Sequence, residues 1–117
     1  MDADKKLQNI VRILDEKKAE DIVAIKTTEV TIVSDYFVIA SGTSSTHVRS
    51  LADDLEDGMS KLGVEPDHIE GRATGWILLD YGETVVHIFS KESREYYNLE
   101  RLWADAQMVD LKDIITD

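Results

Sequence analysis

The chain has 117 residues, of which 43% are apolar and 32% charged, a length and composition that exclude two independent cores and a largely disordered chain. Its 24 acidic and 13 basic side chains give a net charge of −11, which opposes phosphate and argues against general nucleic-acid or anionic-membrane binding. A basic partner surface is the natural complement, although acidity can equally serve solubility alone. We therefore expect a single domain over residues 1–117.

The absence of cysteine excludes disulfides, thiolate nucleophiles and zinc–thiolate sites. The N-terminal residues alternate charged with apolar side chains and form neither a signal peptide nor a transit peptide. No window is apolar for long enough to cross a membrane. These observations predict a soluble cytoplasmic protein.

The first predicted element is a helix over residues 4–18. Its apolar side chains follow one another at spacings of three, one and three, which places them on one helical face. Asp2 or Asp4 can begin the helix, and the lysines at 17 and 18 fall where its last turn should be.

Two strands and a second helix follow. The apolar runs 22–25 and 36–40 are typical of strands that are buried on both faces. The polar run 41–45 should end the second strand, and its hydroxyls can cap the next helix. Residues 48–62 repeat apolar side chains every three or four positions until Gly63 ends that helix.

The second half of the chain predicts a β-hairpin and a further helix. After a short strand at 68–70, residues 76–81 and 85–89 read as two strands joined by the two-residue turn Gly82-Glu83. Beyond Ser93, which can cap, Tyr96, Leu99 and Trp103 share one helical face. The sequence pattern of residues 104–117 predicts neither a helix nor a strand.

This order of elements predicts a mixed β-sheet flanked by helices, of the α/β or α+β class. A helical connection joins parallel neighbours, whereas the short turn joins antiparallel ones.

The residues that enzymes need are missing or misplaced. The loop 42–45 has one glycine and no lysine, which is too little for a phosphate-binding loop. Asp53 and Asp54 lie in mid-helix, where neighbours diverge by about a hundred degrees, so they read as a solvated face rather than a magnesium site. The three histidines never have the spacing of a helical metal site. We expect no catalytic residue, no metal and no cofactor.

The hairpin has one face of unusual composition. If Gly82-Glu83 is the turn, alternation places Ile77, Leu79, Tyr81, Val86 and Ile88 on a core-facing side. The other side collects Trp76, Leu78, Asp80, Val85, His87 and Phe89. Large aromatic side chains beside a few polar ones are typical of a protein-binding hot spot. The alternative is that a helix covers this side and His87 bonds to Asp80 or to backbone.

Several segments together resemble one protein family. They are Asp35-Tyr36-Phe37-Val38-Ile39-Ala40-Ser41-Gly42 with Ser44, Glu70-Gly71, Gly75-Trp76-Ile77-Leu78-Leu79-Asp80-Tyr81-Gly82, Val85-Val86-His87-Ile88-Phe89, Arg94, and Tyr97-Asn98-Leu99-Glu100-Arg101-Leu102-Trp103. In order and over nearly the whole chain, they resemble the bacterial ribosomal silencing factors, also called Iojap-like proteins. The usual basic or amide residue after the serine-rich turn is replaced here by Thr46-His47.

The resemblance implies a sheet similar to that of nucleotidyltransferases but without their catalytic carboxylates. It also implies a non-enzymatic repressor that binds the large ribosomal subunit at ribosomal protein fourteen of that subunit. The repressor blocks joining of the small subunit under nutrient limitation, and is a homodimer when free of ribosomes. Carried over by position, the partner-binding residues are Trp76, Leu78, Asp80, Tyr81 and His87, with Glu70 and Gly71 shaping the neighbouring loop.

Two other functions remain open from the sequence. One is an adaptor for assembly of the large ribosomal subunit that uses the same surface. The other is a residual nucleotide-binding or nucleotidyltransferase-like domain, which rests on the resemblance of fold and on the turn Gly42-Thr43-Ser44.

Overall fold

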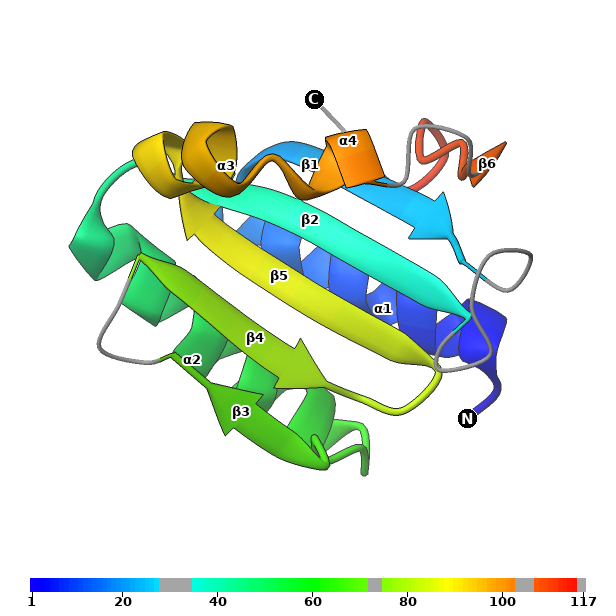
Figure 1. Ribbon diagram of the computed structural model, residues 1–117. Helices are drawn as coiled ribbons and strands as arrows, with labels where there is room; N and C mark the ends of the chain where they lie inside the picture. Colours follow the sequence, from blue (N-terminus) through cyan, green and yellow to red (C-terminus); the bar gives the residue numbers. More distant parts are fainter. Residues whose placement is uncertain (28–34, 72–74, 103–106, 116–117) are drawn as a thin grey trace.

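The computed structural model describes residues 1–27, 35–71, 75–102 and 107–115, and the structural statements below concern these ranges. They form a mixed six-stranded sheet in the order β3-β4-β5-β2-β1-β6 (Figure 1). The strands are β1 (Glu20–Lys26), β2 (Tyr36–Gly42), β3 (His68–Glu70), β4 (Trp76–Asp80), β5 (Thr84–Ser90) and β6 (Gln107–Met108). The central strands β2 and β5 are parallel, and all other neighbours are antiparallel. The predicted fold class is therefore confirmed.

Two long helices, α1 (Ala3–Glu16) and α2 (Ser45–Lys61), cover one face of the sheet and lie behind it in Figure 1. Each begins at a side-chain cap: Asp2 accepts a hydrogen bond from the backbone nitrogen of Lys5 at 2.8 Å, and Ser44 accepts one from that of His47 at 3.0 Å. The main core lies between these helices and the sheet. Its fully buried members include Ile10, Val11, Leu14, Val38, Leu51, Leu55, Met59, Ile77, Leu79 and Ile88.

The hairpin of β4 and β5 has the predicted register. Trp76 pairs with Phe89, Leu78 with His87, and Asp80 with Val85. At the turn, the backbone nitrogen of Tyr81 donates to the carbonyl of Thr84 at 2.9 Å. Gly82 has φ +84°, a left-handed conformation that glycine adopts without steric cost and that fixes the register of the two strands.

The predicted helix after Ser93 is wrong in its cap and its continuity. Ser90 caps α3 (Lys91–Tyr97) by accepting from the backbone nitrogen of Ser93 at 3.2 Å. Asn98 then takes φ +45° and ends this helix, and the single turn α4 (Leu99–Leu102) follows it. Asparagine tolerates the left-handed region better than most residues, so it can end a helix that apolar spacing alone would continue. Trp103 lies outside the described residues.

Three element boundaries also differ from the prediction. The strand β2 continues through Ser41 and Gly42, because both pair with β5. The helix α1 ends at Glu16, and Lys18, with φ +69°, already belongs to the turn. In the tail, the short strand β6 pairs with β1, and Leu111 is buried in the core. Within the described ranges, no helix is both long and apolar enough to cross a membrane.

Candidate partner-binding face

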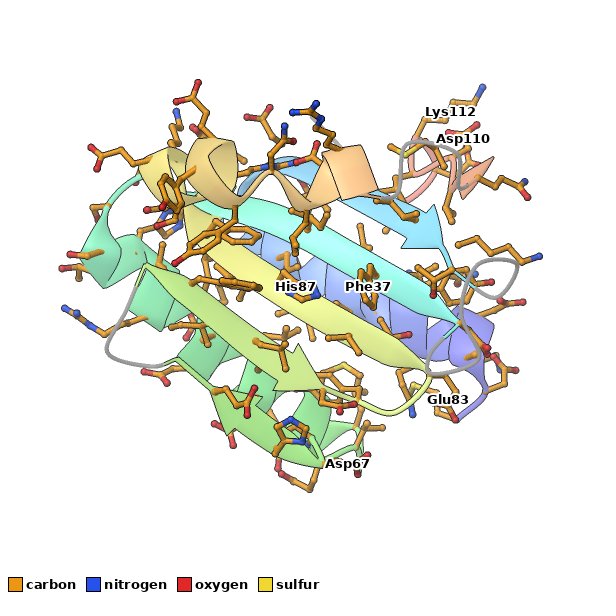
Figure 2. All side chains as sticks on the ribbon, in the orientation of Figure 1. Phe37, Asp67, Glu83, His87, Asp110 and Lys112 are labelled. Carbon is orange, nitrogen blue, oxygen red and sulfur yellow. The ribbon has the colours of Figure 1, made fainter. Side chains whose placement is uncertain are left out.

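The sheet has a second face, opposite α1 and α2, which we call the outer face. It carries Val23 and Ile25 from β1, Phe37, Ile39 and Ser41 from β2, His68 and Glu70 from β3, Trp76, Leu78 and Asp80 from β4, and Val85, His87 and Phe89 from β5. Figure 2 shows Phe37 and His87 on this face with no helix in front of them. The helix α3 lies over one end of the face, and beside it Leu99 of α4 packs against the cluster of Ile25, Ile39 and Phe89 (Figure 1). Alternation along the hairpin thus sorts these side chains as expected, and the half-exposed ones on β2, β4 and β5 are Phe37, Trp76, Leu78 and Asp80, whereas the others of β2 and β5 are buried.

The covered end is an aromatic cluster. The ring of Trp76 stacks on that of Phe89 at a centroid distance of 5.0 Å and meets that of Tyr97 at 4.7 Å. Gly75 permits this close approach, because a Cβ there would lie 2.6 Å from the hydroxyl of Ser93 and 3.0 Å from that of Ser90, so these side chains would have to shift. Trp76 is held from two sides and still remains half-exposed.

His87 lies in the middle of the outer face and is 4% exposed. The indole nitrogen of Trp76 donates to its Nδ1 at 3.1 Å, so the proton of the neutral ring resides on Nε2. The ring of Phe37 packs against it at 4.9 Å, and Nε2 is buried with no hydrogen-bond partner in the described ranges. Burial lowers the pKa of His87 to about 4, and the imidazole is therefore neutral at physiological pH.

Asp80 is not the partner of His87, although the covered alternative allowed a bond from His87 to Asp80 or to backbone; the bond of His87 is to Trp76. One carboxylate oxygen accepts from the backbone nitrogen of Gly82 at 2.8 Å, and the other lies 3.6 Å from Nδ1 of His68. The side chain of Asp80 is 27% exposed. It is therefore held in a fixed orientation at the rim of the outer face and still reaches solvent, where it can meet a cation.

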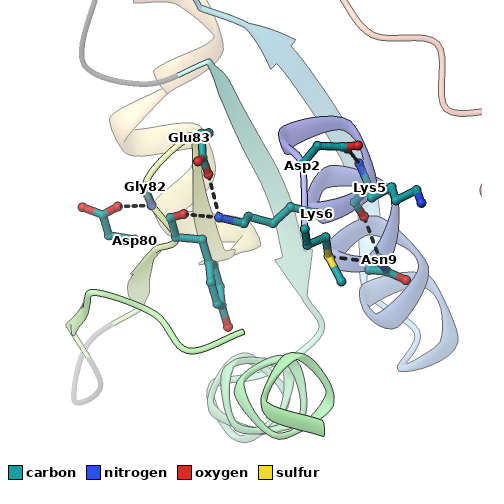
Figure 3. Close-up of polar contacts among 9 residues, drawn as sticks. Asp2, Lys5, Lys6, Asn9, Asp80, Gly82 and Glu83 are labelled. Atoms are coloured by element: carbon teal, nitrogen blue, oxygen red, sulfur yellow. Dashed lines mark hydrogen bonds and ion pairs between the residues drawn. The ribbon is translucent and has the colours of Figure 1, made fainter. Parts of the chain in front are cut away.

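Tyr81 does not join the other candidate residues. Its side chain is 3% exposed and packs in the main core, on the opposite side of the sheet. Burial raises the pKa of its phenol, and the hydroxyl has no hydrogen-bond partner in the described ranges. Its backbone carbonyl accepts from Nζ of Lys6 at 3.0 Å, and the same Nζ pairs with Glu83 at 2.6 Å, as Figure 3 shows for Lys6 and Glu83. The side chain of Tyr81 supports the hairpin from the core side and does not face a partner.

Glu70 and Gly71 line a pocket of about 360 Å³ beside the aromatic cluster. The rest of its lining is Gly75, Trp76, Leu78, Ser93 and Tyr97. Gly71 itself has φ +84° at the end of β3. Glu70 pairs with Leu78 across β3 and β4, which brings its carboxylate to the outer face.

The features considered for nucleotide chemistry have structural roles. Ser44 of the loop caps α2, and His47 ties that loop to α1 by accepting from the backbone nitrogen of Thr43 at 2.9 Å and contacting the carbonyl of Lys17 at 3.0 Å. Asp53 is exposed on α2, away from the outer face. In the part of the chain that the structure describes, no three acidic or histidine side chains gather as metal ligands would.

Three residues at or beside the outer face are not among the partner-binding residues expected from the sequence. Phe37 lies beside His87 because β2 and β5 pair in parallel, and Tyr97, at the end of α3, contacts Trp76. His68 approaches Asp80 across β3 and β4. The sequence signals for them are the predicted strands 36–40 and 68–70 and the segments of the family resemblance that contain Phe37 and Tyr97.

A sheet with one helix-covered face and, on the other face, half-exposed aromatic and apolar side chains beside an oriented carboxylate is typical of a protein-binding module. The comparison with known proteins identifies the module. A family model described as "Ribosomal silencing factor during starvation" matches residues 1–117, and the chain belongs to this family. The resemblance seen in the sequence is confirmed, and the family is one of non-enzymatic regulators, as expected.

Relatives and solved structures agree with this assignment. The chain is 40% identical over 111 residues to the ribosomal silencing factor RsfS of Halalkalibacterium halodurans, covering 94% of this chain and 95% of that protein. It is 37% identical over 98 residues to mouse "Mitochondrial assembly of ribosomal large subunit protein 1", covering 80% of this chain and 43% of that protein. A crystal structure from Chromobacterium violaceum superposes with a TM-score of 0.86 at 28% identity, covering 89% of this chain and 88% of the other.

Proposed function

We propose that this protein is a translational repressor that binds the large ribosomal subunit through ribosomal protein fourteen and sterically blocks joining of the small subunit. The proposal places it in the cytoplasm, acting under nutrient limitation. The observation that carries it is the row of half-exposed side chains on β4, Trp76, Leu78 and Asp80, in a chain of the ribosomal silencing factor family. No chemical step is needed, because joining is suppressed to the extent that the free concentration of the factor exceeds its Kd.

The outer face offers two kinds of contact. Trp76 and Leu78 are half-exposed apolar side chains that can act as buried anchors, and the oriented carboxylate of Asp80 can form a charge-assisted bond to a lysine or arginine. His87 holds Trp76 from below and contributes to the shape of the face. The net charge of −11 favours a basic ribosomal protein over bare RNA and steers the encounter.

Co-sedimentation with purified large subunits tests the proposal. We expect Trp76→Ala to weaken binding by at least about thirtyfold, because loss of a central aromatic anchor costs about 2 kcal/mol or more. Asp80→Lys should weaken binding to the subunit by a comparable factor. Asp53→Lys, which makes the same charge change on α2, should leave that binding unchanged. Circular dichroism checks that each variant is folded.

Two results would contradict the proposal. If the wild-type protein fails to sediment with the subunit, the function is wrong. If it sediments and both outer-face variants bind as well as Asp53→Lys, the site is wrong. Binding should also weaken as salt rises, since the steering charges are screened.

A second function is favoured by the name of the mouse relative, which refers to assembly of the large ribosomal subunit. An assembly adaptor would use the same face on maturing subunits. A joining assay with mature subunits separates the two functions, because an adaptor that acts only in assembly leaves joining unchanged.

We also propose that the protein is a homodimer when free of ribosomes. The outer face exposes apolar surface that a second copy can cover, so pairing and subunit binding would exclude one another.

A further inference from the structure

The pocket beside the aromatic cluster combines apolar walls with one acidic group. The rings of Trp76 and Tyr97 meet at 47° and form one aromatic wall, and Leu78 adds an aliphatic surface. Glu70 is exposed at the pocket, and no described residue forms an ion pair with it. A volume of about 360 Å³ is near the lower end of ligand sites, about 300–1,000 Å³, and is suited to one large side chain.

The charge around the pocket favours a cation. The strands β2, β3, β4 and β5 contain no lysine or arginine, whereas Glu70 and Asp80 both lie on the outer face. The two basic residues of α3 are already engaged: Lys91 pairs with Glu20 at 2.6 Å, and Arg94 donates to Glu100 and to Ser41, each at 2.9 Å. Among the described residues that line the pocket, a phosphate or a carboxylate would meet only the like charge of Glu70, and a purely apolar side chain would leave that carboxylate unpaired.

We propose that this pocket receives the side chain of one arginine from the basic protein that docks on the outer face. The inference rests on the proposed function for its partner and deepens it by naming the recognised group. A planar guanidinium can stack on Trp76 or Tyr97 and pair with Glu70 through two parallel hydrogen bonds. Lysine has a compact, strongly hydrated charge that stacks less well, which favours arginine as the occupant.

The fold explains why the pocket is preformed. Gly75 lets α3 approach β4, and the backbone nitrogen of Ser90 donates to the Gly75 carbonyl at 2.9 Å, so the start of α3 is fixed against the strand. This places Tyr97 against Trp76 before any partner arrives, so that the two rings form one continuous aromatic wall of the pocket. A preformed wall reduces the entropy that binding an arginine would otherwise cost.

The pocket is tested directly by NMR titration of the full chain with blocked amino acids. The probes are N-acetyl-arginine methylamide and its lysine, citrulline and norleucine counterparts, and the reporters are the Trp76 indole and the Gly71 and Gly75 amides. We expect saturable binding of the arginine probe in the millimolar range and at least roughly tenfold weaker binding of citrulline, which has the same shape without the charge. Glu70→Gln should weaken the arginine probe roughly threefold or more, and Glu16→Gln on α1 should not.

The inference is overturned if citrulline, norleucine or lysine binds as tightly as arginine, or if Glu70→Gln binds arginine like the wild type. Co-sedimentation with large subunits then separates this failure from failure of the proposed function. If the wild-type protein sediments with the subunit, and Glu70→Gln binds the subunit as well as Glu16→Gln does, the pocket has no role in docking. Absence of wild-type sedimentation refutes the proposed function, and the titration with blocked amino acids still decides what the pocket binds.

Discussion

We expect His87 to make the folded protein less stable as the pH falls below 6.5. Its pKa is about 4 in the folded protein, because burial disfavours the charged ring, against an ordinary value of 6.5 in the unfolded chain. Between pH 4 and pH 6.5 this histidine is protonated in the unfolded chain and neutral in the folded protein, so lowering the pH favours unfolding. Protonation would also place a hydrogen on Nδ1, opposite the indole N–H of Trp76 that now donates to it.

The size of the effect follows from the two pKa values. The full difference corresponds to about 3 kcal/mol, of which about 2 kcal/mol is lost between pH 7 and pH 5. His87→Gln removes the titrating group and keeps an oxygen that can accept from Trp76. Carboxylates titrate in both proteins, so their contribution cancels when the two pH dependences are subtracted.

Urea unfolding of both proteins at pH 7 and pH 5 measures this difference. The stability of the wild-type protein should fall by about 2 kcal/mol more than that of His87→Gln, which corresponds to about 1 M in the urea midpoint. The reasoning is refuted if the two proteins lose the same stability over this range, or if the wild type becomes more stable at pH 5. An NMR titration of the His87 ring would show which of the two pKa values is in error.

Two further predictions concern the hairpin. Tyr81→Phe removes a buried hydroxyl that has no hydrogen-bond partner in the described ranges. It should therefore raise the free energy of unfolding by about 1 kcal/mol and Tm by several degrees, and leave binding to the large subunit unchanged. A lower Tm, or weaker binding, would contradict this. Lys6→Met should lower the free energy of unfolding, measured by urea titration, by about 1 kcal/mol, because the Tyr81 carbonyl loses its hydrogen-bond donor and Glu83 loses its ion-pair partner. The control Lys5→Met, at an exposed neighbouring position, should have almost no effect in the same titration.

The parts of the fold that were predictable are those set by local patterns. The hairpin register followed from a two-residue turn with glycine first, since one such turn fixes every pair along both strands. The end of α2 at Lys61 followed from apolar spacing and from Gly63. Asn98 was missed because its left-handed conformation interrupts a helical pattern that continues on both sides of it.

The candidate site was predictable only in part, because it joins distant segments. Alternation correctly placed Tyr81 on the core side, yet the family resemblance included it among the partner-binding residues, and its side chain does not reach the outer face. The approach of Phe37 to His87 depends on the parallel pairing of β2 with β5, for which the sequence has no local signal. Whether a helix covers the face is likewise a property of packing, and here α3 and Leu99 of α4 cover the part of the face around Phe89.

The parallel pairing of β2 with β5 also governs when the outer face comes into existence. Tyr36 and Thr84 are about fifty positions apart along the chain, and bringing such distant strands together is slow compared with forming a helix or a hairpin. Until that seam closes, Phe37 is separated from the surface that carries Trp76. The complete outer face, with Phe37 beside His87, therefore forms only when the central seam of the sheet closes, whereas Trp76, Leu78 and Asp80 already share one side of the β4–β5 hairpin.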